Sequence, residues 1–274
     1  MSGLLQISDA HFGTERPQVV AALERLTAQI APELVVLSGD ITQRATRAQF
    51  AAARAFVDRL QVPQVLAIPG NHDIPLFHLG ARLLSPYGRY RRAFGSEQDP
   101  HFTSPDWMVL MLNTTRWYRH SDGEVSEAQI ERTAARLAEA TPRQVRIVIT
   151  HQPVMVTRTD DLTNRLHGRD RAVARWSDAG ADLILGGHIH LPFVRPLNEA
   201  FADCPPTRWA VQAGTAVSSR VRSGKPNSVN VVHPQMQGAR RACRVERWDY
   251  SSDEDAFVCA ESMPLPLSGG LLIS

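Results

Sequence analysis

Five short apolar runs, each followed by residues that bind metal ions in proteins, constrain the fold of this chain more than any other feature. The runs are Leu4–Ile7, Leu34–Leu37, Val65–Ile68, Ile147–Ile149 and Leu183–Leu185. Each run is typical of a short buried strand. In chain order, the residues that follow them are Asp9 and His11, Asp40, Asn71 and His72, His151, and His188 and His190. Because an open α/β sheet binds its ligands outside the carboxyl ends of its strands, we expect these side chains to converge.

The segments between the first three runs have helical character. Pro17–Ile30 carries apolar residues at helical spacing, and Pro17 suits the first turn of a helix. Thr46 can cap a second helix that ends at Leu60. The order strand, helix, strand, helix, strand, at about thirty residues per unit, favours a parallel sheet with right-handed crossovers.

The rest of the chain departs from this rhythm. Residues 74–105 are rich in proline and glycine, and we interpret them as a cap-like insertion over the site. Further expected elements are a strand at Met108–Leu112 and helices starting near Ser126 and Asp170. Short alternating runs then predict antiparallel strands that complete a second sheet packed on the first, at Arg208–Gln212, Gly214–Arg222, Val229–His233 and Cys243–Tyr250. We therefore expect one domain over residues 1–260 and a peripheral tail over residues 261–274.

Composition excludes several classes of protein. The net charge of +2 argues against an obligate nucleic-acid partner or an anionic membrane surface. No apolar stretch approaches the ~20 residues of a membrane helix, and the first residues are predicted to form a strand instead of a signal peptide. Three cysteines, an odd number, fit a reducing compartment. We expect a cytoplasmic protein.

The residue types after the strands suit two divalent cations. The carboxylate of Asp40 can bridge both ions, with one shell completed by Asp9, His11 and His190 and the other by Asn71, His151 and His188. Two cations ~3.5 to 4 Å apart can clamp both ends of an in-line phosphoryl displacement. His72 is then left to protonate the leaving group or to donate a hydrogen bond to the phosphoryl group. Imidazole and carboxylate ligands suit Mn, Fe, Zn or Co about equally.

Over residues 3–250, the ordered motifs resemble the calcineurin-like metallophosphoesterase superfamily. They are Asp9-Ala10-His11, Gly39-Asp40, Gly70-Asn71-His72-Asp73, His151 and Gly187-His188-Ile189-His190. The resemblance implies an α/β (α+β) fold, a two-sheet β-sandwich flanked by helices, with a dinuclear metal site at the strand ends. Within the superfamily, the motifs and the chain length look most like the class III cyclic-nucleotide phosphodiesterase group.

At two positions this chain differs from other groups of the superfamily. Gln43 and Arg44 stand where the protein Ser/Thr phosphatases carry an Asp-Arg pair, so Asp73 or another residue must orient the catalytic imidazole. The lipid A precursor hydrolases usually replace the motif's histidine with arginine, whereas this chain keeps His72.

Several residues keep two interpretations. Asp73 has either a catalytic part or only hydrogen bonds to the loop backbone. Arg44 could hold a substrate phosphate or simply begin a helix, and Asn113 could contact substrate or belong to a turn. Arg220 and Arg222 could face the site or the solvent. In the insertion, aromatic and basic residues could stack on and bind a nucleotide, or cover a helix surface: Phe77, Tyr87, Arg89, Tyr90, Arg91 and Arg92.

The expected function is hydrolysis of a small phosphodiester substrate, best a cyclic nucleotide. The expected mechanism is direct attack of a metal-bridging hydroxide, without a covalent enzyme intermediate. The alternatives are a phosphomonoesterase, a nucleotide or nucleotide-sugar pyrophosphatase, a nuclease, and a non-catalytic metal-binding scaffold.

Overall fold

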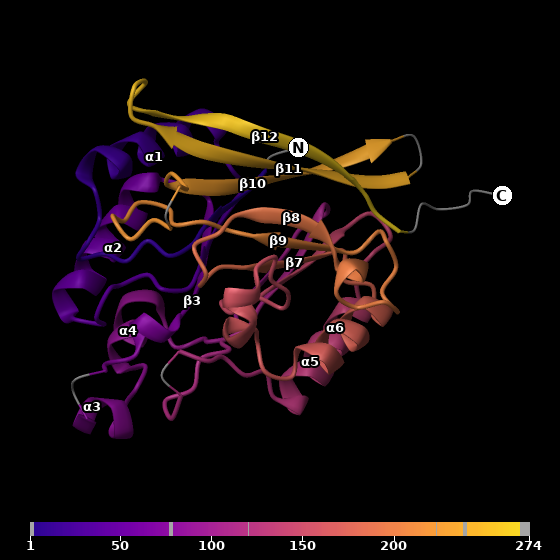
Figure 1. Ribbon diagram of the computed structural model, residues 1–274, viewed down its shortest axis with the longest axis horizontal. Coiled ribbons are helices and arrows are strands. Elements are labelled where there is room, and N and C mark those ends of the chain that lie inside the picture. Colours follow the sequence, from indigo (N-terminus) through magenta and orange to yellow (C-terminus); the bar gives the residue numbers. More distant parts are fainter. Residues whose placement is uncertain (1–2, 77–78, 120, 223, 238–239, 269–274) are drawn as a thin grey trace.

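Two six-stranded sheets stack face to face, with helices on both outer faces (Figure 1). The computed structural model describes residues 3–76, 79–119, 121–222, 224–237 and 240–268. The two-sheet sandwich flanked by helices is the architecture that the sequence predicted. No helix within these residues is long and apolar enough to cross a membrane.

The first sheet has the strand order β12-β11-β10-β1-β2-β3. Its strands β1, β2 and β3 are parallel, and β10, β11 and β12 form an antiparallel meander that joins the edge of β1. Their bounds are β1 Leu4–Ile7, β2 Leu34–Ser38, β3 Gln64–Ile68, β10 Ser228–Gln237, β11 Arg240–Ser251 and β12 Ala256–Pro266.

The second sheet has the order β4-β5-β6-β7-β9-β8. Strands β5, β6, β7 and β9 are parallel, with β4 and β8 antiparallel at the two edges. Their bounds are β4 His101–Thr103, β5 Trp107–Met111, β6 Val145–Ile149, β7 Leu183–Gly186, β8 Phe193–Pro196 and β9 Trp209–Gln212.

Side-chain alternation along the strands builds three apolar layers. Successive strand residues point to opposite faces, so Leu5 packs against the helices on the outer face of the first sheet while Leu4 faces the second sheet. Trp107 and Ile147 meet Leu4 in the layer between the sheets. The outer face of the second sheet is covered through side chains such as that of Trp176, which is fully buried.

Helices α1 and α2 cover the first sheet, and α5 and α6 cover the second. Pro17 begins α1, and Thr46 caps α2 in a capping box with Gln49, as predicted. Two short helices, α3 and α4, lie in the predicted insertion. The bounds are α1 Pro17–Ile30, α2 Arg47–Leu60, α3 Leu79–Leu84, α4 Gly88–Phe94, α5 Glu127–Ala138 and α6 Arg169–Asp178, with short 3-10 helices at Asn71–Asp73, Thr159–Asn164 and Leu197–Glu199.

Three expectations about the C-terminal half need correction. Of the expected antiparallel strands, Val229–His233 and Cys243–Tyr250 lie in β10 and β11 and extend the first sheet, whereas Arg208–Gln212 corresponds to β9 of the second sheet and pairs parallel with β7. Residues 214–222 are a loop, because backbone N–H groups there donate to other loops: Ala216 to Ser8 and Ser219 to Thr14. Residues 261–266, expected in a tail, belong to β12, where Leu265 is fully buried; residues 269–274 lie outside the described residues.

Candidate metal centre

The loops after β1, β2, β3, β6 and β7 meet at one edge of the sandwich. Backbone hydrogen bonds tie them together: Asp9 donates to Gly39 over 3.1 Å, His11 to Asp40 over 3.0 Å, and Gly187 to His151 over 2.8 Å. Because these bonds use the main chain, the loops hold their side chains in fixed positions relative to one another. The convergence expected from the strand ends is therefore present.

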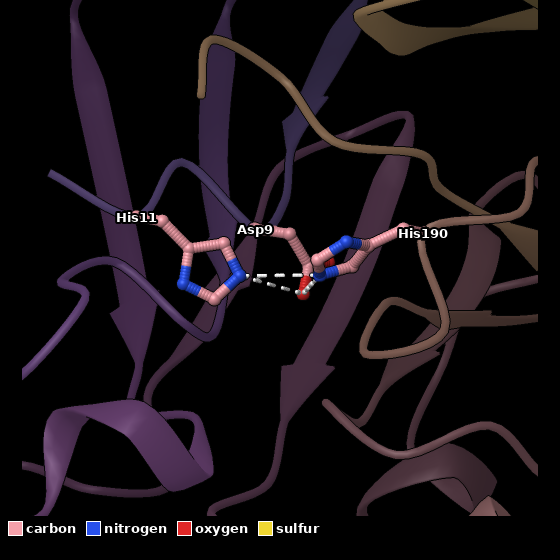
Figure 2. Close-up of side chains that lie close together, drawn as sticks. All are labelled: Asp9, His11 and His190. Carbon is pink, nitrogen blue, oxygen red and sulfur yellow. Dashed lines mark hydrogen bonds and ion pairs between the residues drawn. The ribbon is translucent and has the colours of Figure 1, made fainter. Parts of the chain in front are cut away.

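Asp9, His11 and His190 form the first group of candidate ligands (Figure 2). Nε2 of His190 lies 3.2 Å from Oδ1 of Asp9 and 3.1 Å from Nε2 of His11. The three side chains come from two distant parts of the chain and point toward a common centre. Ser8 donates to the other carboxylate oxygen of Asp9 over 2.6 Å, which fixes its orientation.

Asp40, His151 and His188 form the second group. Oδ1 of Asp40 lies 3.3 Å from Nε2 of His151, and its Oδ2 lies 3.8 Å from Nε2 of His11 in the first group. Asp40 thus lies between the two groups with one oxygen toward each, the position expected of a bridging carboxylate.

Backbone carbonyls set the direction of two of the imidazoles. Nδ1 of His151 donates to the carbonyl of Ser38 over 2.9 Å, and Nδ1 of His190 donates to the carbonyl of Arg220 over 2.6 Å. Because a carbonyl oxygen only accepts, each ring presents its other nitrogen, Nε2, to the centre. Such contacts fix the tautomer and orientation of metal-binding histidines.

Backbone conformation at the site is strained. Five of the candidate ligands have positive φ angles: Asp9 at 53°, His11 at 44°, Asp40 at 48°, His188 at 72° and His190 at 55°. A left-handed conformation costs of order 1 to 3 kcal/mol for residues other than glycine, and it persists where surrounding contacts impose it. The fold therefore spends stability to place these side chains.

Burial and the closeness of carboxylates to imidazoles shift the pKa values of the candidate ligands. Burial alone would raise the pKa of Asp9, but His190 overrides it and lowers the pKa to about 2. Burial would lower the pKa of His151, yet the neighbouring Asp40 raises it to about 9. Burial lowers the pKa of His11 to about 3 and that of His188 to about 4. Asp9, His11 and His188 therefore favour the deprotonated forms that bind metals.

Unsatisfied polar atoms support a cation site here. Oδ1 of Asn71 and Nδ1 of His188 are buried without a hydrogen-bond partner in the described part of the chain. Buried polar groups are normally satisfied, and these two belong to side chains that line the same hollow as Asp40. Carboxylate, amide and imidazole donors together suit Mn, Fe, Zn or Co, so the residues present fit two divalent ions.

His72 lies at the edge of the centre. Its backbone N–H donates to Oδ1 of Asp40 over 2.8 Å, and its ring packs edge-on against His11 with centroids 4.9 Å apart. Its Nδ1 donates to the carbonyl of Gln43 over 2.9 Å, and its Nε2 faces Arg220 at 3.3 Å. The ring also comes within 4.8 Å of ligand atoms of His11 and Asp40, so it borders both groups.

Of the two interpretations of Asp73, the structure shows the hydrogen bonds to the loop backbone. Asp73 is fully buried and accepts from the backbone N–H groups of Ile41, Thr42 and Gly70 at 2.8 to 3.0 Å. The residue that orients the His72 ring is Gln43, through its carbonyl. Burial, together with the charge of Asp40, raises the pKa of Asp73 to about 6. Asp73 joins the loops after β2 and β3.

The two predicted substrate contacts have different surroundings. Arg44 lines a hollow of about 140 Å³ beside Asn71 and His72, which keeps it close to the centre. Asn113 does not line that hollow; its amide oxygen accepts from the backbone N–H of Thr115 at 2.9 Å and its own N–H donates to Asp99. These contacts favour the turn interpretation of Asn113, because its polar atoms bond to its own loop and to the segment before β4.

In the described part of the insertion, the contacts of Tyr87, Arg89 and Tyr90 do not support the nucleotide-stacking interpretation. Tyr90 is buried, with its hydroxyl donating to the carbonyl of Ala67 over 2.6 Å. The hydroxyl of Tyr87 donates to the carbonyl of Thr115 over 3.0 Å. Arg89 donates to the carbonyl of Ala45 over 2.8 Å. Phe77 lies outside the described residues.

A larger hollow, of about 410 Å³, opens over the centre. Its walls include Asp40, His72 and His188, together with polar residues that the sequence motifs did not identify: Ser121, Asp161 and Asn164. These come from loops without metal-ligand spacing, so nothing in their local sequence distinguished them. Arg220 and Arg222 also line it, which resolves their two interpretations in favour of the site.

Two sequence relatives are named as cyclic nucleotide phosphodiesterases. The chain is 28% identical over 216 residues to a probable cyclic nucleotide phosphodiesterase of Synechococcus sp., a match that covers 74% of this chain and 80% of that protein. It is 25% identical over 201 residues to the 3′,5′-cyclic adenosine monophosphate phosphodiesterase CpdA of Escherichia coli strain K12, covering 68% of this chain and 69% of that protein.

Among solved structures, the purple acid phosphatase PPD1 of yellow lupin seeds superposes with a TM-score of 0.70 at 11% identity. The match covers 97% of this chain and 53% of that one, so the chain spans about half the length of that protein, and the likeness is one of fold. The model of the calcineurin-like phosphoesterase family matches residues 3–192, more than half of the chain. The chain therefore belongs to the calcineurin-like phosphoesterase family.

Proposed function

We propose that this chain is a dinuclear metal-dependent phosphodiesterase that hydrolyses a small phosphodiester, with a cyclic nucleotide as the favoured substrate class. The observation that carries the proposal is the position of Asp40, whose two oxygens face the two groups of candidate ligands at 3.3 and 3.8 Å. The names of the two sequence relatives, both cyclic nucleotide phosphodiesterases, support the choice of substrate class.

In this proposal Asp9, His11 and His190 would hold one cation, Asn71, His151 and His188 would hold the other, and Asp40 would contribute to both sites. When bound, two divalent cations lower the pKa of an attacking water and neutralise charge on the phosphoryl oxygens. The attacking oxygen comes from water, so no covalent enzyme intermediate is required.

The residues around the cations supply orientation and a proton. His72 is held by its own backbone bond to Asp40 and by its Nδ1 bond to Gln43, so Nε2 faces the hollow. From there, the imidazolium form of His72, which carries a proton on both ring nitrogens, can pass the proton on Nε2 to the leaving oxygen of the ester. Arg44, in the smaller adjoining hollow, is proposed to bind a charged part of the substrate.

The hollow favours a small substrate. Its volume of about 410 Å³ is within the ~300 to 1,000 Å³ typical of small-molecule sites.

The three cysteines are unpaired, with Cys204 and Cys243 buried and Cys259 exposed, which supports a reducing cytoplasmic location.

The test is a hydrolysis screen of the full chain supplied with manganese, iron, zinc or cobalt. It should compare 3′,5′- and 2′,3′-cyclic nucleotides with nucleotide monophosphates and nucleotide-sugar pyrophosphates. We expect a cyclic nucleotide to be opened to its monophosphate by the wild-type chain and by Asp58→Ala, which removes an exposed carboxylate. Asp40→Ala should be inactive. Consumption of monoesters or pyrophosphates alone would replace the proposal with the corresponding alternative.

A further inference from the structure

Arg220 has a guanidinium group in the hollow over the metal centre. Its NH1 lies 3.3 Å from Nε2 of His72 and donates to Oε1 of Gln43 over 2.9 Å. The side chain is half-buried and lines the hollow together with Asp40 and His188. We propose that Arg220 binds a non-bridging oxygen of the substrate's phosphoryl group, an inference that rests on the proposed phosphoesterase function.

The charge of Arg220 lacks a carboxylate partner among the residues that the structure describes. Its side-chain contacts are with a neutral amide oxygen and an imidazole. Arg222, two residues on, differs: its NH1 contacts both carboxylate oxygens of Asp161 at 2.8 and 2.9 Å. Guanidinium groups bind carboxylates and phosphates through several N–H donors. The arginine without a carboxylate is therefore the one prepared to receive an anion.

Buried residues and hydrogen bonds hold the segment that leads to Arg220. Ala216, Val217 and Ser218 are fully buried, and Asn227 donates to the carbonyl of Ser218 over 2.8 Å. The backbone N–H of Arg220 itself donates to Oγ of Ser218 over 3.0 Å. A donor that is positioned before the substrate arrives costs little reorganisation during the reaction. These contacts position the backbone of Arg220 beside the metal centre.

Arg220 is also joined to the metal centre through its main chain. Its carbonyl accepts from Nδ1 of His190 over 2.6 Å, which turns the other nitrogen of that ring toward Asp9. The same residue therefore orients a candidate ligand with its backbone and presents a guanidinium with its side chain. Substitution of the side chain retains the carbonyl, so metal binding and phosphoryl binding can be tested separately.

The contact with His72 indicates what the incoming phosphoryl group replaces. Nδ1 of His72 donates to the carbonyl of Gln43, so Nε2 accepts the N–H of Arg220 in the arrangement seen. A phosphoryl oxygen between the two side chains would take over that N–H, and Nε2, once it has taken up a proton, would face the leaving oxygen. Arg220 and His72 would then contact different oxygens of one substrate.

The test uses inorganic phosphate as the probe and the manganese-loaded chain. Isothermal titration should give the phosphate Kd for the wild type, Arg220→Gln, Arg220→Lys and the control Arg171→Gln. Arg171 is 65% exposed and pairs with Glu127, so its loss matches the change in net charge away from the site. We expect Arg220→Gln to weaken phosphate binding about 10- to 100-fold, as for other hydrogen bonds to charged groups. Arg220→Lys should be intermediate and the control unchanged.

Metal content and thermal unfolding of each variant separate this contact from a structural effect. Normal metal content with weakened phosphate binding in Arg220→Gln supports the proposal. An unchanged phosphate Kd in that variant overturns it. If Arg220→Gln loses metal or folding, Arg220→Lys decides: wild-type phosphate affinity overturns the proposal, and weakened affinity at full metal content supports it. If the wild-type chain binds phosphate but hydrolyses no phosphoester, the proposed function is wrong. The comparison of phosphate affinity between the wild type and the Arg220 variants remains a valid test of the contact.

Discussion

The backbone N–H of His72 donates to Oδ1 of Asp40 over 2.8 Å, which links the candidate proton donor to the candidate bridging ligand. The same oxygen lies 3.3 Å from Nε2 of His151. Any change that separates the loops after β2 and β3 should therefore disturb metal binding and proton transfer together.

Gly70→Ala tests this close approach. A Cβ atom at residue 70 would lie 2.1 Å from the backbone nitrogen of Asp40, so the two loops must separate. We expect the variant to bind less metal and to lose most phosphoesterase activity. Elemental analysis after desalting measures the first effect, and turnover of a chromogenic diester measures the second.

Gly80→Ala is the matched control, because a Cβ atom there meets nothing within 4 Å and alanine is favoured in a helix. It should keep wild-type metal content and turnover. If Gly70→Ala behaves in the same way as Gly80→Ala, the contact between the two loops is not needed to hold the cations.

His72→Ala should separate chemistry from metal binding. General acid catalysis commonly contributes ~10²- to 10⁴-fold in rate, so we expect a kcat loss in that range with retained metal. The loss should shrink for nitrophenyl esters, whose leaving group needs little protonation. His101→Ala, at an exposed histidine, should leave kcat unchanged. Equal losses on good and poor leaving groups would argue against proton donation by His72.

Asp73→Ala should primarily destabilise the fold. The substitution leaves the backbone N–H groups of Ile41, Thr42 and Gly70 without their buried acceptor. Each unsatisfied buried donor costs about 1 to 3 kcal/mol, so the free energy of unfolding should fall by about 3 kcal/mol or more. Urea denaturation measures this fall. A variant that unfolds like the wild type but has lost turnover would restore a catalytic part for Asp73.

Asp182→Ala tests a structural ion cluster remote from the metal centre. Its buried carboxylate contacts Arg208 at 3.0 Å and Arg241 at 2.7 Å, and so joins a loop of the second sheet to β11 of the first. Removing one partner of a buried ion pair typically costs about 3 to 5 kcal/mol. We expect a loss of that size in unfolding free energy, with unchanged metal content in the folded fraction. Asp203→Ala, at an exposed site, should change stability by less than about 0.5 kcal/mol.

Local signals in the sequence predicted the elements well. Pro17 and Thr46 marked the starts of α1 and α2, and the apolar runs marked the strands that carry the ligand loops. The pairing of strands was less accessible, because an alternating pattern specifies a face and not a neighbour. The register of Leu4 opposite Val232 joins residues from the two ends of the chain, and nothing in either local sequence determines it.

Some residues of the candidate site could be predicted from local sequence, and others could not. The candidate ligands were predictable because their residue types follow strands whose ends must meet. The roles of Asp73 and Asn113 were not, since a buried carboxylate or amide serves a substrate or its own loop with the same residue type. Only the hydrogen bonds to Thr42 and Thr115 distinguish the two. The position of Arg220 beside the metal centre could be seen only in the structure, because contacts with residues distant in the sequence hold its loop in place.

The central claim, that a dinuclear centre built on Asp40 hydrolyses phosphodiesters, is tested most directly by metal reconstitution. The chain should be stripped with a chelator, titrated with manganese, and assayed on a chromogenic phosphodiester and the matching monoester at equal concentrations. We expect no turnover without metal. Activity should reach its plateau near two equivalents of manganese per chain, and the diester should be hydrolysed faster than the monoester. Turnover that survives chelation, saturates at one equivalent, or favours the monoester by a wide margin would contradict it.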